Sequence, residues 1–322
     1  MSSPYLKPHT PSWKTTEEHE FRDKVPAYIQ EALDRNLLPL KAISEISYFG
    51  TGENSVVAKI SEGRRSFILR FAFMDGLVDH EVFFMKAWEK TGVRVPQIIS
   101  HHCTDSQVSV SFIVYEYVQE PLLSDALTAE EMIRSGISRE IGRTSALMHT
   151  LKGKNFGYPS QANPRRGVFA SLREELEEWL SLNERCVLYE KKVLNDNSRK
   201  RVADAIGVLE MDMVRIAIPS LTHNDFRPYN MFYTRPKITI FDPFPRITHP
   251  MMCLGGTILK AMLEGGGDAE VSEILKGYRE IGEVDENVLD AAIVLRVMSS
   301  LPSWYAKGRM KKIEKAVKVA RL

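Results

Sequence analysis

The sequence has few cysteines, no long apolar run and almost no net charge. Cys103, Cys186 and Cys253 lie far apart and form no C-x-x-C pair, which argues against a disulfide framework or a zinc site and favours a reducing cytoplasm. Neither a run of about 18 apolar residues nor the apolar core of a signal peptide is found, so we expect no membrane association. A formal net charge of +1 gives no field that would attract nucleic acid. We expect a soluble cytoplasmic protein, either a monomer or a homodimer.

The order of the apolar patterns predicts an α+β protein. The 322 residues are 43% hydrophobic and 26% charged, as in ordinary globular proteins with a sizeable core. Short strand-like runs occur first, and a helical pattern at 75–91 interrupts them. These runs lie at 42–49, 55–60 and 66–71, and within 93–100 and 109–118. Helical spacing dominates from residue 128 onward.

We therefore expect three regions. An arm and a helix occupy 1–40, a sheet of five antiparallel strands occupies 41–118, and a mostly helical region occupies 119–322. Within the last region a loop is expected at 155–167, and amphipathic helices are expected at 168–186 and 196–216. The first of these helices carries glutamates opposite its apolar side, namely Glu174, Glu175, Glu177, Glu178 and Glu184. Four further helices are expected after residue 242.

The stretch at 221–243, LTHNDFRPYNMFYTRPKITIFDP, contains four polar residues at strand ends or in the loop between strands. They are His223, Asp225, Asn230 and Asp242. Kinase-like phosphoryl transfer uses one carboxylate to deprotonate the attacking hydroxyl, and an amide oxygen with a second carboxylate to hold Mg²⁺. Asp and Asn beside Pro are also common in ordinary turns. Four matched positions between strand-like runs favour a kinase catalytic centre.

At these residues the chain resembles the aminoglycoside-phosphotransferase and choline-kinase-like family of small-molecule kinases. The loop of that family reads like HGDxxxxN, and a later apolar strand ends in Asp; here the text is HNDFRPYN and then ITIFDP. The resemblance implies a bilobal, protein-kinase-like fold. It also implies that Asp225 is the catalytic base, that Asn230 and Asp242 are Mg²⁺ ligands, and that His223 fixes the loop. ATP would be the phosphoryl donor, with GTP as the alternative.

The same resemblance suggests a phosphate-binding region in the sheet. Gly50, Gly52, Asn54 and Ser55 lie in a loop between two strands, where glycine lets backbone N–H groups approach phosphates; an ordinary hairpin explains this loop equally well. Arg70 on the third strand takes the place of the lysine that grips phosphates in protein kinases. Lys59 is the rival, but it falls on the second strand. Glu81 is the expected partner of Arg70, and Glu89 is the alternative.

Two further segments fit the resembling family less closely. The run that ends at Glu116 and Val118 corresponds to the crossing between lobes, where the backbone would meet adenine; a buried edge strand is the simpler alternative. After Asp242 the family often has an acidic segment that supports the site, whereas this chain has Thr248-His249-Pro250. His249 is a candidate replacement. His149 is expected in the core or at a helix cap.

The predicted function is Mg²⁺-dependent phosphorylation of a hydroxyl on a small molecule. An aminoglycoside-like antibiotic or another cationic alcohol is one acceptor, which the glutamates of 168–186 would attract. The same glutamates also fit an ordinary solvated helix face. A choline-like amino alcohol or a sugar is the alternative acceptor, with Trp304 and Tyr305 as a candidate aromatic cage. A protein kinase is disfavoured because no A-P-E-like segment follows Asp242, and a nucleotide-binding pseudokinase is the alternative of another class.

Overall fold

The computed structural model describes residues 15–49, 55–73, 76–104, 109–180 and 193–322, and these fold as two units. The first unit contains the chain up to Phe83 together with Val95–Gln119. The second contains Phe84–Arg94 and Glu120–Leu322. Gly50, Gly52 and Asn54 lie outside the described residues.

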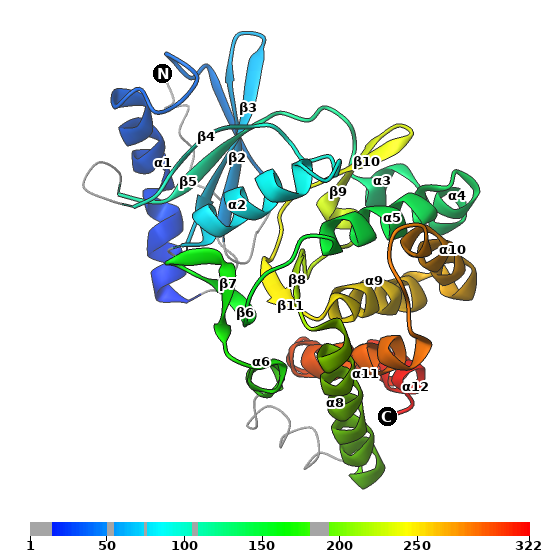
Figure 1. The fold of residues 1–322 in the computed structure, drawn as a ribbon. Helices are drawn as coiled ribbons and strands as arrows, with labels where there is room; N and C mark the ends of the chain where they lie inside the picture. The colour runs from blue at the N-terminus through cyan, green and yellow to red at the C-terminus, as the bar shows by residue number, and fades with distance from the viewer. Residues whose placement is uncertain (1–14, 50–54, 74–75, 105–108, 181–192) are drawn as a thin grey trace. The chain divides into compact units, whose positions relative to one another are not determined.

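The first unit is built on an antiparallel sheet of five strands in the order β1-β2-β3-β5-β4, drawn in blue to green in Figure 1. The sheet confirms the prediction. Its elements are α1 (Thr16–Asp34), β1 (Glu45–Phe49), β2 (Ser55–Glu62), β3 (Arg65–Ala72), β4 (Ile98–His102), β5 (Phe112–Glu116) and the first part of α2 (Leu77–Glu89).

Helix α1 covers one face of this sheet. It begins at a capping box, in which Thr15 and Glu18 each bond the other's backbone N–H, an arrangement that satisfies two free donors at a helix start. Val25 and Ile29 are fully buried in a core that also contains Ile60 and Phe71 of the sheet. The helix runs through Pro26 without a break.

The second unit is mostly helical, as predicted. Its helices are α3 (Leu123–Ala126), α4 (Ala129–Arg134), α5 (Ile137–His149), α6 (Leu172–Trp179), α8 (Asp196–Ile216), α9 (Pro250–Glu264), α10 (Gly267–Arg279), α11 (Glu286–Ala306) and α12 (Met310–Ala320), with a short 3₁₀ turn η1 (Pro228–Asn230). Its strands are β6 (Phe156–Ser160), β7 (Asn163–Phe169), β8 (Ser220–Thr222), β9 (Met231–Thr234), β10 (Lys237–Ile240) and β11 (Arg246–Thr248). The four helices expected after residue 242 are all present.

A four-stranded sheet in the order β7-β6-β11-β8 corrects two predictions. The loop expected at 155–167 forms β6 and most of β7, which pair with each other, and β6 also pairs with β11, which lies far along the chain: Ile247 is the partner of Gly157. The helix expected at 168–186 begins only at Leu172, since Val168 and Phe169 belong to β7. Gly157 has a φ of 91°, a left-handed conformation that favours glycine.

The hairpin β9–β10 appears where the sequence predicts two short strands. Its register pairs Met231 with Ile240 and Thr234 with Lys237 across the turn at Arg235-Pro236. Residues that flank the two strands, Asn230 before β9 and Phe241 after β10, are therefore brought together, which is the feature that positions the site.

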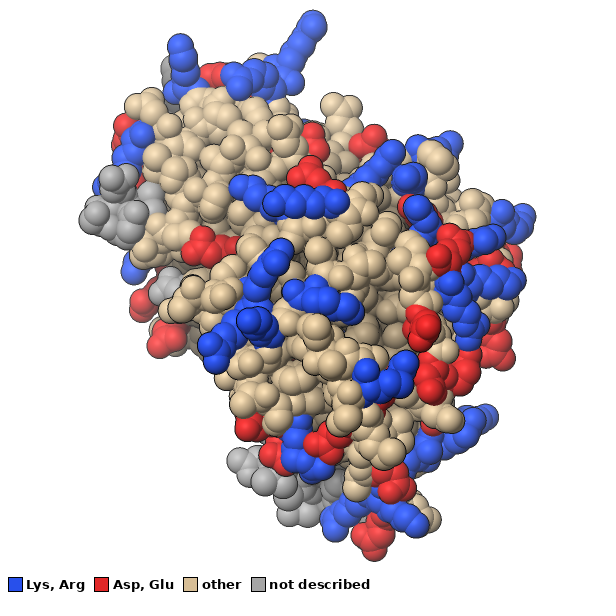
Figure 2. Space-filling view, viewed as in Figure 1, with Lys and Arg blue, Asp and Glu red and all other residues tan. Residues whose placement is uncertain are grey.

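The exposed charges are mixed in sign over part of the helical unit. On the face drawn in Figure 2, acidic and basic side chains are interspersed where Figure 1 places α10, α11 and α12. Pairs such as Arg279 with Glu286 and Lys312 with Glu264 link them. Among the helices that the structure describes, none has the length and apolar character needed to cross a membrane.

Candidate active site

His223 anchors the loop that follows β8. Its buried Nε2 donates to the carbonyl of Phe241 at 3.0 Å, and its ring stacks on Trp88 with 5.7 Å between centroids and 6° between planes. Burial lowers the pKa of His223, against the opposing effect of Asp225. A neutral imidazole therefore joins the start of the loop to the end of β10, the position that the resemblance implies for a residue that fixes the loop.

Asn224 adopts a left-handed backbone conformation in the loop and accepts hydrogen bonds from a residue of α11. It has a φ of 58°, a conformation that non-glycine residues adopt rarely and Asn tolerates best. Arg296 donates to its side-chain oxygen at 2.8 Å and to its carbonyl at 3.1 Å. A Cβ on Gly256 would lie 2.8 Å from Nε of Arg296. Glycine at position 256 therefore makes room for the guanidinium.

Asp225 is half-buried and contacts two cations. Its Oδ1 lies 3.3 Å from Nζ of Lys260, and its Oδ2 lies 2.6 Å from the guanidinium of Arg227. Burial by itself raises the pKa of this carboxyl, but Lys260 and Arg227 more than offset it, so that the pKa falls below its usual value. The carboxylate is ionised at neutral pH, as a general base must be.

Asn230 lies against Asp225 and beside the residue that precedes Asp242. Its Nδ2 donates to the carbonyl and to Oδ2 of Asp225 at 2.8 and 2.9 Å. Its carbonyl accepts from the N–H of Phe241 at 3.0 Å. The exposed Asp242 follows directly, with a φ of 51°. The β9–β10 hairpin thus joins the three predicted residues in one place.

The donor atoms at this place suit Mg²⁺. Because Nδ2 makes both hydrogen bonds of the Asn230 side chain, Oδ1 is left as a ligand oxygen, and Asp242 supplies an exposed carboxylate. Amide and carboxylate oxygens are the ligands that Mg²⁺ prefers. The residues present therefore fit the ion that the resemblance implies.

A cavity of about 240 Å³ opens beside the loop, entirely within the helical unit. The catalytic loop contributes Phe226, Arg227 and Tyr229 to its wall, and α9 contributes Lys260. On α10, Glu270 is 5% exposed and lines the cavity. Burial raises its pKa, and the nearby Glu264 adds to that effect. The cavity therefore combines two cations near Asp225 with a buried carboxyl.

Sequence alone places this chain in a family. The family model of the phosphotransferase enzyme family matches residues 45–243, which include the sheet, the catalytic loop and Asp242. The chain belongs to the phosphotransferase enzyme family. It is a small-molecule phosphotransferase with a hydroxyl acceptor, which confirms the predicted family and enzyme class. No curated protein sequence matches it.

Solved structures with a similar fold agree with that family. Aminoglycoside phosphotransferase APH(4)-Ia is 14% identical with a TM-score of 0.63, covering 91% of this chain and 97% of that chain in one of its ternary complexes with AMP-PNP and hygromycin B. Spectinomycin phosphotransferase APH(9)-Ia, solved with ADP and spectinomycin, is 12% identical with a TM-score of 0.58 and coverage of 90% and 97%. A candidate fructosamine-3-kinase from Thermobifida fusca is 15% identical with a TM-score of 0.55 and coverage of 87% and 94%. These likenesses confirm the protein-kinase-like fold.

In the first unit of this phosphotransferase, Arg70 of β3 forms a buried ion pair with Glu81 of α2. The phenol of Tyr115 also donates to Glu81. The pairing that the sequence predicts is confirmed, while the phosphate-binding role of Arg70 stays a prediction. Lys59 lies on β2, and its Nζ lies 4.2 Å from the ring centroid of Tyr117.

The other predicted nucleotide-binding residues also lie in the first unit. Ser55 is buried at the start of β2, and Glu116 ends β5, where its carboxylate accepts from the N–H of Gln97 at 2.9 Å. Val118 is half-buried just before the unit ends at Gln119. No contact with a nucleotide is defined, so these three roles stay predictions.

The predicted acidic helix face is partly wrong. Glu175 is 1% exposed, and its carboxylate accepts from Arg246 at 3.2 Å and from Thr248 at 2.6 Å. Glu178 lies 3.5 Å from the same guanidinium. Because Arg246 belongs to β11, the sequence around 168–186 gives no sign of this partner. Glu174 and Glu177 are exposed, and Glu184 lies outside the described residues.

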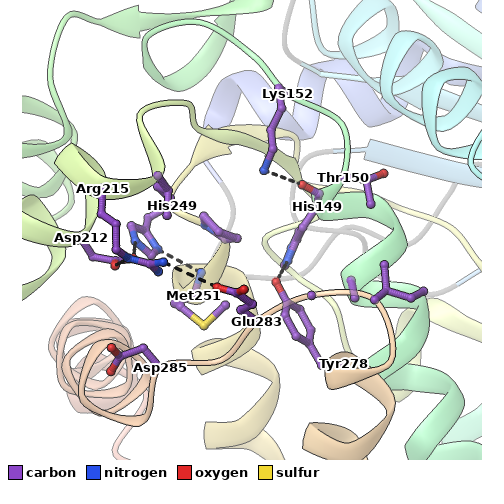
Figure 3. A pocket seen from close by; sticks show the side chains of 15 residues that line it. His149, Thr150, Lys152, Asp212, Arg215, His249, Met251, Tyr278, Glu283 and Asp285 are labelled. Atoms are coloured by element: carbon purple, nitrogen blue, oxygen red, sulfur yellow. Dashed lines mark hydrogen bonds and ion pairs between the residues drawn. The ribbon is translucent and has the colours of Figure 1, made fainter.

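His249 and His149 lie on opposite sides of a second cavity of about 250 Å³ (Figure 3). The Nδ1 of His249 accepts the N–H of Met251 at 3.1 Å, so its Nε2 donates to Asp212 at 3.0 Å. His149 contacts the hydroxyl of Tyr278 at 2.9 Å through Nδ1. His249 therefore caps α9 and contacts Asp212, while His149 lies in the core as predicted.

Sequence reasoning missed three residues that act on the catalytic loop. Arg227 lies two positions after Asp225 within the motif itself, so its spacing could have identified it. Lys260 and Arg296 lie in apolar helices, 35 and 72 positions from their partners. Neither has a local pattern that distinguishes it from an ordinary surface cation.

Proposed function

We propose that this phosphotransferase moves the terminal phosphoryl group of ATP, or alternatively GTP, to a hydroxyl of a small molecule, with Mg²⁺ bound. One observation carries the proposal: the hydrogen bonds from Asn230 to Asp225 and from Phe241 to Asn230 gather the residues proposed as base and metal ligands around one hairpin. The nucleotides in the solved structures of APH(4)-Ia and APH(9)-Ia support the choice of donor.

Asp225 is the residue that accepts the proton. Its ionised carboxylate takes the hydroxyl proton of the acceptor as the oxygen attacks phosphorus, and Asn230 and Arg227 hold the carboxylate in position. Asn230 and Asp242 would hold Mg²⁺, which supplies charge neutralisation for the phosphate oxygens. Catalysis then rests on alignment and electrostatics rather than on a covalent intermediate.

Arg70 and Ser55 are proposed to bind the phosphates, with the loop of Gly50, Gly52 and Asn54. Glu81 is proposed to orient Arg70, which agrees with their ion pair. A guanidinium can bind two phosphate oxygens at once. The backbone at Glu116 and Val118 is proposed to contact the base of the nucleotide.

Substitution of Asp242 by Ala tests the metal assignment. The variant should fold and lose Mg²⁺-dependent affinity for ATP by about 10-fold or more, the usual effect of losing a charged ligand contact. Calorimetric titration with ATP, with and without Mg²⁺, measures this change. The control is Asp268→Ala in the exposed first turn of α10, which should bind like the wild type. Unchanged binding by Asp242→Ala would remove Asp242 from the metal site.

For the acceptor we propose a cationic alcohol of the aminoglycoside kind. The hygromycin B and spectinomycin bound to the two solved phosphotransferases support this class. The aromatic cage for choline has less support, because Nζ of Lys312 lies 5.0 Å from the ring centroid of Trp304, so a cation of the chain itself already covers that ring. Incubating the protein and MgATP with a panel of antibiotics, amino alcohols and sugars, and looking for the mass gain of one phosphate, identifies the acceptor.

A further inference from the structure

Lys260 links the catalytic loop to the cavity beside it. It lies in the fourth turn of α9, and its Nζ is 3.3 Å from Oδ1 of Asp225. The same side chain lines the cavity formed with Phe226 and Tyr229 of the loop. Since Arg227 and Asn230 both contact Oδ2 of Asp225, Oδ1 is the oxygen on the side of Lys260. Lys260 therefore both contacts the base and lines the space that an acceptor can enter.

The placement of this lysine has a cost. The side chain is only 22% exposed, and burial of an ammonium group is unfavourable unless its hydrogen bonds are satisfied. Within the described residues Asp225 supplies one bond, whereas an ammonium group has three donors. An oxygen atom from a ligand in the cavity would use another donor. Arg227 already neutralises Asp225, so charge balance alone does not require a second cation.

We propose that the cavity holds the acceptor and that Lys260 is a further catalytic residue, whose ammonium group binds the attacking hydroxyl oxygen. This inference rests on the proposed function. In the step, the O–H bond breaks and its proton goes to Asp225. The oxygen forms a bond to the terminal phosphorus of the nucleoside triphosphate, and the bond from that phosphorus to the diphosphate leaving group breaks. Lys260 stabilises the negative charge that develops on the oxygen, and it keeps its own protons.

The surroundings of Lys260 give the proposal a pH signature. Burial lowers the pKa of this lysine to about 8, against the opposing effect of Asp225. The other charged groups around it are Arg227 of the loop, Arg296 of α11, Glu264 of its own helix and Glu270 across the cavity on α10. Catalysis requires the ammonium form, so activity should fall as pH rises through about 8. Arginine stays charged throughout this range.

Hydrolysis of ATP with water as the acceptor tests the proposal without a known substrate. Lys260→Met should lower the rate of MgATP hydrolysis at pH 7 by about 10²- to 10³-fold, the range for losing one charge-stabilising donor. Lys260→Arg should keep activity at pH 7 within about 5-fold and move the alkaline decline above its wild-type position. The matched control, Lys312→Met, removes a lysine that pairs with Glu264 and should behave like the wild type.

Comparison with Asp225→Asn separates the possible failures. If Asp225→Asn abolishes hydrolysis but Lys260→Met stays within about 2-fold of the wild type, Lys260 has no catalytic role. An alkaline decline that Lys260→Arg does not move also excludes a catalytic role for Lys260, and this measurement remains available if the Met variant does not fold. If Asp225→Asn hydrolyses ATP as fast as the wild type, the proposed function itself is wrong, and the role of Lys260 fails with it.

Discussion

Two groups of buried titratable residues in the helical unit differ in their protonation: one surrounds Asp225, and the other surrounds His149 and His249. Around Asp225 the carboxylate stays ionised, because Lys260 and Arg227 stabilise it against burial. Around the second cavity the imidazoles of His149 and His249 stay neutral, because burial lowers their pKa values to about 3 and about 4. The carboxylate of Asp225 is therefore charged beside an open cavity, whereas the two imidazoles are uncharged in the interior.

The difference follows from the partners that each group has. An ionised side chain can remain in a half-buried place when opposite charges and hydrogen bonds compensate for lost hydration. His149 has a phenol beside it and Lys152 nearby, which further disfavours the imidazolium. His249 has Asp212, but that carboxylate also binds Arg215. The two imidazoles are thus neutral at neutral pH, whereas Asp225 is an ionised carboxylate beside an open cavity, which favours Asp225 as the place of the chemistry.

Removing the charge at Asp225 tests the comparison most directly. Asp225→Asn should fold and bind ATP, yet lose about 10²–10⁴ in kcat, the range for a lost general base. Steady-state kinetics with the acceptor found in the panel, together with ATP titration, measure both quantities. The matched control is Asp212→Asn, which changes the carboxylate of the other group and should leave kcat within a few-fold. Near-normal turnover by Asp225→Asn would end its role as base.

The buried ion pair of Arg70 and Glu81 in the first unit is a second place where opposite charges compensate for burial. Arg70→Ala should raise the KM for ATP and lower kcat, each by about 10-fold, because a charge-assisted contact is lost. Lys59→Ala should change both by less than about 2-fold. Glu81→Ala should resemble a milder Arg70→Ala, and the double variant should be less than additive because paired residues couple. Should Lys59→Ala prove the more damaging change, Lys59 and not Arg70 contacts the phosphates.

Lowering the pH should destabilise the protein through His249, which is neutral in the folded state. The folded-state pKa of His249 is depressed below its ordinary value of 6.5, so its contribution to stability is present above 6.5 and is lost as pH falls toward 4. From pH 7 to pH 5 this loss amounts to about 2 kcal/mol. In His249→Asn the side chain can still cap α9, and its unfolding free energy should fall about 2 kcal/mol less over that range. Urea unfolding at the two pH values measures it; equal losses in both proteins would show that His249 is charged when folded.

Glu270, which lines the cavity beside Asp225, is expected to give the smallest effect. Its raised folded-state pKa means that its contribution to stability is lost as pH rises above the unfolded value near 4.5. Glu270→Gln should therefore unfold at a higher temperature than the wild type at pH 8, by a few degrees at most, and at an equal temperature at pH 4. Glu273→Gln on the same helix, whose carboxylate pairs with Lys276, is the control. A destabilised Glu270→Gln at pH 8 would mean that the carboxylate has a favourable partner.

Local patterns predict the residues at the centre of the candidate site. The motif HNDFRPYN and the two short strands after it predict Asp225, Asn230 and Asp242 together, because the hairpin that joins them is local. Arg70 and Glu81 were also predictable, since strand and helix follow each other directly in the chain. Where residues within about 20 positions of each other form the contacts, the local sequence is sufficient to predict them.

Distant pairing decided what was missed. β8 and β11 have three residues each, too few for a periodic signal, and β6, which forms an irregular hairpin with β7, also pairs with the distant β11. The burial of Glu175 depends on Arg246, 71 residues later. Such distant pairings do not change the local sequence pattern, so the buried Glu175 cannot be distinguished by sequence from its exposed neighbours.

The hydrogen bonds from Arg296 to Asn224 have a consequence for the synthesis of the chain. Arg296, which contacts the loop backbone at Asn224, lies 72 positions later in the chain, on α11. While a ribosome is still adding α11, the nascent chain already has its proposed base, its proposed ligand residues and its hairpin, but it lacks the two hydrogen bonds from Arg296 to Asn224. Competence for catalysis therefore requires the chain to extend beyond residue 296, and a chain that stops before it should contain the whole motif and remain inactive.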